Sequence, residues 1–182
     1  MHAAQEHLAD LLLDHYCRQP HVTLSLCGFP SDSPQHADDF GTDSLRAQVA
    51  ALQHAQPRSF EIDIGALASF TSAPYLTVSD EAGHITALRD CLVLGDNNEP
   101  DGGYTPHVTV GLYAGAWPMP AVLARLLSFV CNEPLRLRID GISLLSYAAA
   151  EIGGPLAPMA HYDFSAGTLQ WDAPPLVRDG CY

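Results

Sequence analysis

QPHVTLSLCG, residues 19–28, and TPHVTVGLYAG, residues 105–115, share the tetrapeptide Pro-His-Val-Thr at an offset of 86 positions (107 − 21). Each copy opens an apolar run with the alternation of a half-buried strand, in which successive side chains point to opposite faces. One face is apolar in both copies and is expected to face a core. The other face presents a histidine and, two residues later, a hydroxyl: His21 and Thr23 in the first copy, His107 and Thr109 in the second.

The surrounding elements repeat in the same order, which chance produces far less readily than a repeated tetrapeptide. The first half predicts a helix over 3–17, a strand over 21–26, a polar loop over 28–43, a helix capped by Asp43 or Ser44, and strands over 59–70 and 74–80. The second half predicts a helix capped by Ser79 or Asp80 and closed near Gly95, an acidic loop over 96–103, a strand over 107–113, a helix from Pro120 to Asn132, and strands over 135–147 and 161–166.

This duplication predicts an α+β fold in a single bilobal domain over residues 1–182. The two lobe repeats fall at about 1–80 and 81–182. We expect each lobe to hold an antiparallel sheet and helices, and a pseudo-twofold axis to relate the two. The repeated strands would then face each other across a central cleft.

The amino-acid composition narrows the classes of molecule that this protein is expected to bind. The chain carries eight Arg, no Lys and a net charge of −13, so its surface should repel long nucleic acids, which bind by neutralising many phosphates. No run approaches the roughly 18 apolar residues of a membrane span, and acidic residues stand where a signal peptide would be basic. We expect a cytoplasmic protein without a membrane partner, whose five scattered cysteines are free thiols.

Two His-Thr pairs facing each other could catalyse phosphoryl chemistry. Two imidazoles with ordinary pKa values of about 6.5 can supply one base and one acid near neutral pH. Two hydroxyls can donate hydrogen bonds to phosphate oxygens lying between them. In-line attack at phosphorus needs the base and the acid on opposite sides, an arrangement that a twofold cleft supplies without a metal or another cofactor.

The pattern His-apolar-Thr-apolar, present in PHVTL and PHVTV about ninety residues apart, resembles the two-histidine (2H) phosphoesterase superfamily. That superfamily includes the 2′-5′ RNA ligase and cyclic nucleotide phosphodiesterase group. The resemblance implies metal-independent opening of a 2′,3′-cyclic phosphate to a 2′-phosphate, or cleavage of short 2′-5′ linked oligonucleotides. His21 and His107 would be the acid–base pair, and Thr23 and Thr109 would bind the phosphate of a small nucleotide substrate.

The chain departs from this group in two places. Relatives usually have a strand before the first helix, and within this chain PYLTVSD (74–80) precedes the helix of the second half without a first-half counterpart. The first lobe is therefore expected to lack an edge strand, to borrow one from a partner, or to reflect a shortened reading frame. Many relatives also place an Arg shortly after the second motif, where this chain has Gly111, Leu112 and Tyr113.

Four further side chains are candidates for substrate binding: Tyr104, Tyr113, Ser146 and Tyr147. The aromatic rings can stack on a base or ribose, or pack in the core instead. Arg136 and Arg138 share one strand face and either hold a second phosphate or stay solvated. The alternative to an enzyme is a non-catalytic nucleotide-binding module of the same fold. A metal site built on both histidines would need a third ligand, which neither motif supplies.

Overall fold

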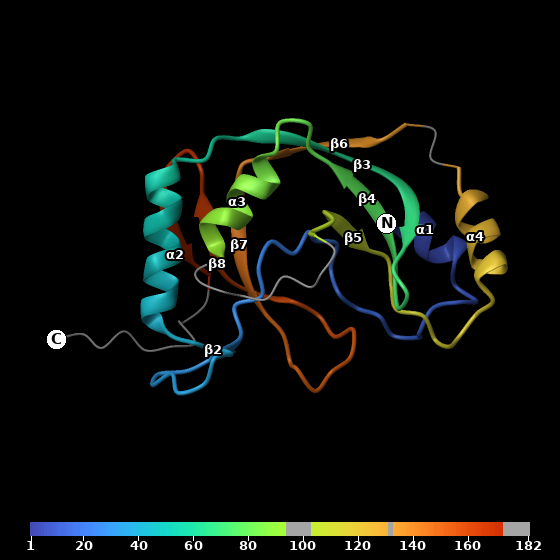
Figure 1. Cartoon of the computed structure of the whole chain (residues 1–182), viewed down its shortest axis with the longest axis horizontal. Helices are drawn as coiled ribbons and strands as arrows, with labels where there is room; N and C mark the ends of the chain where they lie inside the picture. The colour runs from blue at the N-terminus through green and yellow to red at the C-terminus, as the bar shows by residue number, and fades with distance from the viewer. Residues whose placement is uncertain (94–102, 131–132, 173–182) are drawn as a thin grey trace.

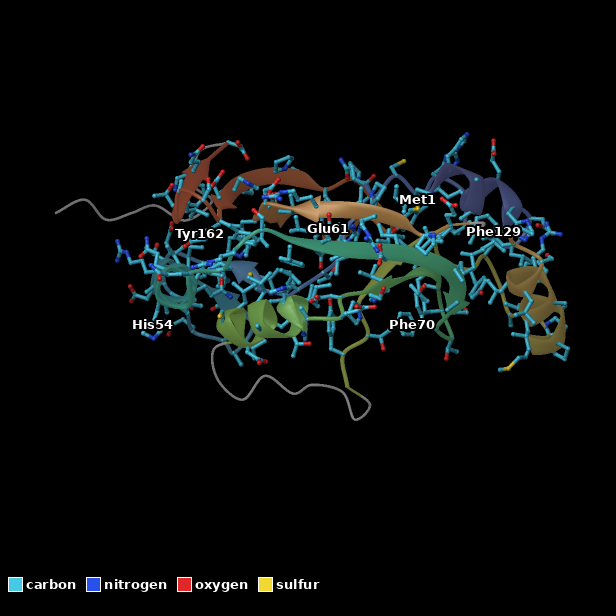
Figure 2. All side chains as sticks on the ribbon, turned by 90° about the horizontal axis from the view of Figure 1, so that it is seen from above. Met1, His54, Glu61, Phe70, Phe129 and Tyr162 are labelled. Atoms are coloured by element: carbon cyan, nitrogen blue, oxygen red, sulfur yellow. The ribbon has the colours of Figure 1, made fainter. Side chains whose placement is uncertain are left out.

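The strand β3 (Phe60–Ser69) runs across the molecule and joins its two ends, as Figure 1 shows. The computed structural model describes residues 1–93, 103–130 and 133–172. Figure 2 places His54 and Tyr162 at one end and Phe129 at the other, with Glu61 of β3 between them. The fold is α+β, as predicted. None of its described helices is long and apolar enough to span a membrane.

The first sheet has four antiparallel strands in the order β5-β4-β3-β6. In it, β3 pairs with β4 (Pro74–Ser79) and with β6 (Leu135–Ile139), and β5 (His107–Thr109) pairs with β4. Alternation along β4 buries Leu76 and Val78, each 7% exposed. Val108 of β5, opposite Leu76, is also buried, so the second Pro-His-Val-Thr motif lies against the core with its histidine and threonine on the other face.

The second sheet has three antiparallel strands in the order β7-β8-β9. They are β7 (Gly141–Ser146), β8 (Ala157–Asp163) and β9 (Thr168–Trp171). The strand predicted over 135–147 is therefore wrong as one element, because β6 pairs with β3 and β7 pairs with β8. The chain changes sheets at Asp140, whose carbonyl accepts a hydrogen bond from the backbone N–H of Phe164. The last strand predicted, over 161–166, begins earlier, and β9 follows it.

The helices gather at the two ends of the molecule. They are α1 (His2–His7), α2 (Thr42–Ala55), α3 (His84–Leu92) and α4 (Met119–Leu127). Figure 1 shows α2 and α3 at the end with the second sheet, and α1 and α4 at the other end. Gln48 joins α2 to α3 by donating from Nε2 to the carbonyl of Leu92 at 2.8 Å. Asp80 accepts from the backbone N–H groups of Ala82 and Ile85 at the start of α3, but the residue at the N-cap position is Gly83 and not the predicted Ser79 or Asp80.

Four local predictions were wrong, and one of them is the cap of α2, which is Gly41 and not Asp43 or Ser44. The helix expected over 3–17 ends at His7, because Leu13 donates its N–H to the carbonyl of Leu112, and Leu12 forms a bridge with Tyr113. Tertiary pairing thus overrides helical spacing. The loop 28–43 contains a short parallel pair, β1 (Phe29–Pro30) with β2 (Asp39–Phe40). Residues 21–26 form no strand with the described residues.

Some predictions concern residues outside the described ranges. The closure near Gly95, the helix end at Asn132 and all but the last residue of the loop 96–103 lie outside the described residues. Among the cysteines within them, Cys17, Cys27 and Cys91 are free thiols. The division into two lobe repeats stays a prediction.

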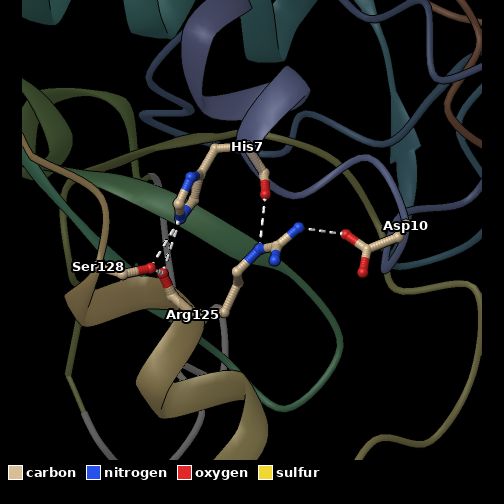
Figure 3. A network of polar contacts seen from close by, with 4 residues as sticks. All are labelled: His7, Asp10, Arg125 and Ser128. Atoms are coloured by element: carbon tan, nitrogen blue, oxygen red, sulfur yellow. Dashed lines mark hydrogen bonds and ion pairs between the residues drawn. The ribbon is translucent and has the colours of Figure 1, made fainter.

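A polar network fastens α1 to α4 (Figure 3). Arg125 donates from Nε to the carbonyl of His7 at 2.8 Å and from a terminal nitrogen to Asp10 at 2.7 Å. Ser128 donates to the carbonyl of Arg125 at 2.8 Å, and His7 Nε2 lies 2.8 Å from the same carbonyl. The contacts of Arg125 with His7 and Asp10 join residues more than a hundred positions apart, so they tie the first half of the chain to the second.

We predict that Leu8→Ala lowers the free energy of unfolding by about 2–5 kcal/mol, because Leu8 is fully buried in the core beside α1 and its truncation leaves a cavity. Leu127→Ala is the matched control, because Leu127 is 76% exposed, and should change stability by less than about 0.5 kcal/mol. Urea unfolding followed by circular dichroism measures both. Equal effects of the two changes would contradict this packing.

Candidate active site

The two Pro-His-Val-Thr motifs meet at one cavity of about 360 Å³. His21, Thr23, His107 and Thr109 all line it, and each is half-buried. They come from sequence positions more than eighty residues apart. The polar faces predicted from the two motifs therefore share one space, open to a ligand and walled by protein.

Both histidines are oriented by the same local hydrogen bond. His21 Nδ1 lies 2.7 Å from the carbonyl oxygen of Gln19, and His107 Nδ1 lies 2.7 Å from that of Thr105. A carbonyl only accepts, so Nδ1 carries the proton in both rings. A proline separates each histidine from its carbonyl partner and restricts the residue before it to extended conformations. Nε2 is then the nitrogen left for chemistry in each ring.

Strand pairing in the first sheet positions the second motif. Thr109 pairs with Tyr75, and His107 pairs with Thr77, across β5 and β4. Cross-strand partners share one face of a sheet, so these side chains lie on the side opposite the buried Val108. The backbone on both sides of His107 is thereby held by strand pairing.

The first motif is positioned differently, by side chains from the second half of the chain. Tyr104 donates from its hydroxyl to the carbonyl of Thr23 at 2.8 Å. Arg89 of α3 donates to the carbonyl of Leu24, and its guanidinium lies 3.7 Å from the centre of the Tyr104 ring. Burial raises the pKa of Tyr104, which keeps its hydroxyl a donor. These side-chain contacts hold a segment that strand pairing does not hold.

A further pair of hydrogen bonds anchors the entry to the first motif. Gln19 donates from Nε2 to the carbonyl of Leu156 at 3.0 Å and accepts from the N–H of Leu156 at 2.7 Å. The side-chain amide thus imitates a backbone pairing. Cys17 extends the contact by donating its N–H to the carbonyl of Gly153 at 2.9 Å.

Aromatic rings surround His107. Phe70 lies 4.9 Å and Tyr75 5.4 Å from the imidazole, both edge-on, and the two aromatic rings stack on each other at 4.3 Å. Phe70 also lines the cavity. Contacts of this kind restrict the rotation of the imidazole. Among the described residues His21 has no ring contact of this kind, so the environments of the two histidines differ although their hydrogen bonds match.

The charge of the cavity comes from few residues. Apart from the histidines, Arg18 is the one cation among its described lining residues and Glu151 the one carboxylate. The Arg18 guanidinium lies 4.5 Å from the centre of the Tyr147 ring and donates to the carbonyl of Gly154 at 3.3 Å. An anionic ligand in this cavity would therefore meet Arg18, in a chain whose net charge is −13.

The candidate substrate-binding residues are dispersed. Tyr147 lines the cavity, whereas Ser146 lines a larger neighbouring groove. Tyr104 and Tyr113 are absent from the described lining of the cavity. Tyr104 holds Thr23, as described above, and the Tyr113 hydroxyl lies 2.7 Å from Ser69 Oγ.

The two arginines of β6 also lie elsewhere. Arg136 pairs with Asp63 at 2.9 and 3.1 Å and lowers the pKa of that carboxyl group, and Arg138 pairs with Asp140 at 2.8 Å. Both guanidiniums are largely exposed, so the solvated alternative describes them better than a phosphate clamp.

Sequence reasoning missed Arg18, Phe70 and Tyr16, all of which line the cavity. Arg18 had a usable signal, because it is one of only eight basic side chains in a lysine-free chain and precedes the first histidine by three positions. Phe70 and Tyr16 had none. Each reaches the cavity through tertiary packing, and an aromatic residue at either position equally suits a core.

The comparisons with known proteins agree with this geometry. The family model of the 2′-5′ RNA ligase superfamily matches residues 2–151, which include both motifs and Arg18. The chain belongs to the 2′-5′ RNA ligase superfamily, and the predicted likeness to two-histidine phosphoesterases is confirmed. No curated protein matches the chain. Membership supports phosphoesterase or ligase chemistry of this superfamily in general.

We predict that Tyr104→Phe loosens the first motif and not the second, because it removes the hydrogen bond to the Thr23 carbonyl. Stability should fall by about 0.5–1.5 kcal/mol, the usual net effect of one hydrogen bond. The imidazole NMR signals of His21 should shift or broaden, while those of His107 stay in place.

Tyr113→Phe is the matched control, because it removes a tyrosine hydroxyl bonded to Ser69 and not to the first motif. The account fails if His21 responds equally to both changes, or to neither.

Proposed function

We propose that this protein hydrolyses small phosphodiesters with a 2′ linkage, either a nucleoside 2′,3′-cyclic phosphate or a short 2′-5′ linked oligonucleotide. The observation that carries the proposal is the pairing of two Nδ1-protonated histidines on one cavity. Because both Nδ1 atoms are already engaged by backbone carbonyls, both Nε2 atoms are available to exchange protons with a ligand.

For a 2′,3′-cyclic phosphate, the reaction needs only these two nitrogens and water. One neutral imidazole accepts a proton at Nε2 from water as the water oxygen bonds to phosphorus. The second histidine, protonated, donates from Nε2 to the 3′ oxygen as the bond from phosphorus to that oxygen breaks. The product is a 2′-phosphate and a 3′-hydroxyl group, and the two histidines have exchanged protonation states.

The other lining groups would stabilise the phosphate. The hydroxyls of Thr23 and Thr109 would donate to its non-bridging oxygens, and the guanidinium of Arg18 would offset their negative charge. Arg18 thus takes the role of a cation that the second motif lacks. The substrate has to be small, because the cavity measures about 360 Å³ and the chain as a whole is strongly acidic.

A second candidate is a non-catalytic nucleotide-binding module of the same fold. The feature that favours it is the first motif, which lies outside any strand pairing and depends on Tyr104 and Arg89. Incubation with 2′,3′-cyclic nucleotides in EDTA separates the two candidates. Formation of a 2′-phosphate, read by NMR, supports the enzyme. Binding of the cyclic nucleotide without product would point to the module or to a 2′-5′ linked oligonucleotide as the substrate, and absence of product from a 2′-5′ linked dinucleotide as well would contradict the enzyme.

We predict that His21→Ala and His107→Ala each lower kcat/KM by at least about 10²-fold, the smaller end of the usual contribution of general acid–base catalysis. The two losses should be far from additive, because the histidines act as one unit. The wild-type pH–rate profile should be bell-shaped, because one histidine must be neutral and the other charged. Substantial turnover in either variant with folding intact would refute the acid–base pairing.

We predict that Arg18→Gln weakens binding of a nucleoside 2′-phosphate about 10- to 100-fold, since hydrogen bonds to charged groups are each worth about 1.5–3 kcal/mol. Isothermal titration calorimetry measures the effect. Arg46→Gln is the matched control, because Arg46 lies on α2 beside Asp43 and outside the cavity, and it should leave affinity unchanged. Equal losses in both variants would point to a general charge effect.

A further inference from the structure

The loop between β7 and β8, residues 147–156, forms a large part of the wall of the candidate active site. Its residues that line the cavity are Tyr147, Ala149, Glu151, Ile152 and Gly153. The same loop lies against residues 16–19, the segment that leads into the first motif. The loop and the first motif are therefore neighbouring parts of one wall, and the contacts between them decide how the two are held together.

The first contacts between the loop and this segment bring the two backbones close together. Cys17 donates its N–H to the carbonyl of Gly153 at 2.9 Å, and Arg18 donates from Nε to the carbonyl of Gly154 at 3.3 Å. Gly153 has a φ of +69°, and a Cβ at this position would lie 2.8 Å from Cδ2 of the Tyr16 ring. The close approach therefore requires a glycine on both grounds, backbone conformation and space.

Gln19 makes the most complete contact with the loop. Its Nε2 donates to the carbonyl of Leu156 at 3.0 Å, and its Oε1 accepts from the N–H of Leu156 at 2.7 Å. The Leu156 residue is only 8% exposed, so it provides a fixed partner. Because one backbone residue binds both polar groups of the amide, the Gln19 side chain is held in one orientation.

The backbone of Gln19 also orients His21. Its carbonyl accepts the hydrogen bond from His21 Nδ1 at 2.7 Å. Residues 18–28 make no backbone–backbone hydrogen bond to the described residues, so strand pairing within the described chain does not fix this carbonyl. The nearest contact that does is the amide of the same residue. A side chain of the first motif thus does what backbone pairing does in a sheet.

The second motif provides the internal comparison. There the carbonyl of Thr105 accepts from His107 Nδ1, and the next carbonyl along the chain, that of Pro106, accepts from the N–H of Val78 at 3.3 Å. Pairing of β5 with β4 then begins at His107 itself. Backbone hydrogen bonds therefore hold the segment 105–107, whereas the side chain of Gln19 holds the segment 19–21.

We propose that Gln19 is a positioning residue for the reaction, a role that rests on the proposed function. Its side chain fastens its own carbonyl to the loop 147–156, and that carbonyl keeps the neutral proton of His21 on Nδ1. A ring released from the carbonyl can carry its proton on Nε2 instead, and an imidazole in that form cannot accept a proton there. Gln19 is absent from the described lining of the cavity, so it acts through His21 and not on the substrate.

The first test is the effect of Gln19→Met on the two kinetic constants for a 2′,3′-cyclic nucleotide. Methionine keeps the length of the side chain and removes both hydrogen bonds to Leu156. We expect kcat to fall at least about tenfold, since a displacement of about 1 Å in a reacting group can cost about 10²-fold. KM should change less than about twofold, because Cys17 and Arg18 still hold the loop.

The second test is spectroscopic. Long-range ¹H–¹⁵N spectra of Gln19→Met should show the Nε2-protonated form of His21, while His107 keeps its proton on Nδ1. Gln53→Met is the matched control, because Gln53 also donates from Nε2 to a distant carbonyl, that of Gly167 at 3.4 Å, but lies outside the cavity. This control should leave kcat and both histidine spectra unchanged.

An unchanged His21 spectrum in Gln19→Met would overturn the proposal, whatever the activity. Equal changes at His21 and His107 would also overturn it, because they would indicate a general loosening of the fold. So would a rise in KM with kcat unchanged. Circular dichroism confirms folding, and Gln19→Ala removes the same two hydrogen bonds if Gln19→Met does not fold. If the wild-type protein shows no turnover, the spectra still decide the role of Gln19, and the lack of turnover counts only against the proposed function.

Discussion

The hydrogen bond from histidine Nδ1 to the carbonyl two residues upstream is the interaction on which the site depends. It occurs twice, at His21 and His107, with the same 2.7 Å separation and the same intervening proline. It sets the tautomer and the ring orientation from local backbone alone. The rest of the fold then has one task at the site, which is to bring two pre-oriented rings to one cavity.

Different interactions hold the two histidines in place. At His107 the backbone is part of the four-stranded sheet, and Phe70 and Tyr75 restrict the ring. At His21 the backbone has no strand partner among the described residues. Instead, Tyr104 and Arg89 donate hydrogen bonds to the carbonyl groups of the first motif and its neighbour. Two side-chain contacts replace a strand. The first motif is therefore the less constrained partner, and a groove of about 1330 Å³ lies directly beside it.

Local patterns predicted the α+β class, the superfamily and the meeting of the two motifs, because strand alternation and the repeated tetrapeptide are properties of short stretches. The strands β3 and β4 were predicted for the same reason. The division of 135–147 between two sheets was not predicted, because sheet membership depends on partners distant in sequence. The lack of strand pairing at 21–26 among the described residues was not predicted either. Alternation shows which side chains of a strand share a face, but it does not show which strand lies beside it.

The most direct test of the account is the protonation of the two rings. Long-range ¹H–¹⁵N spectra of the histidines, assigned with His21→Gln and His107→Gln, report the tautomer of each imidazole. The account predicts a proton on Nδ1 and a free Nε2 in both neutral rings, and simultaneous shifts of both Nε2 signals when a nucleoside 2′-phosphate is added. A proton on Nε2 in either ring, or a response confined to one histidine, would contradict it.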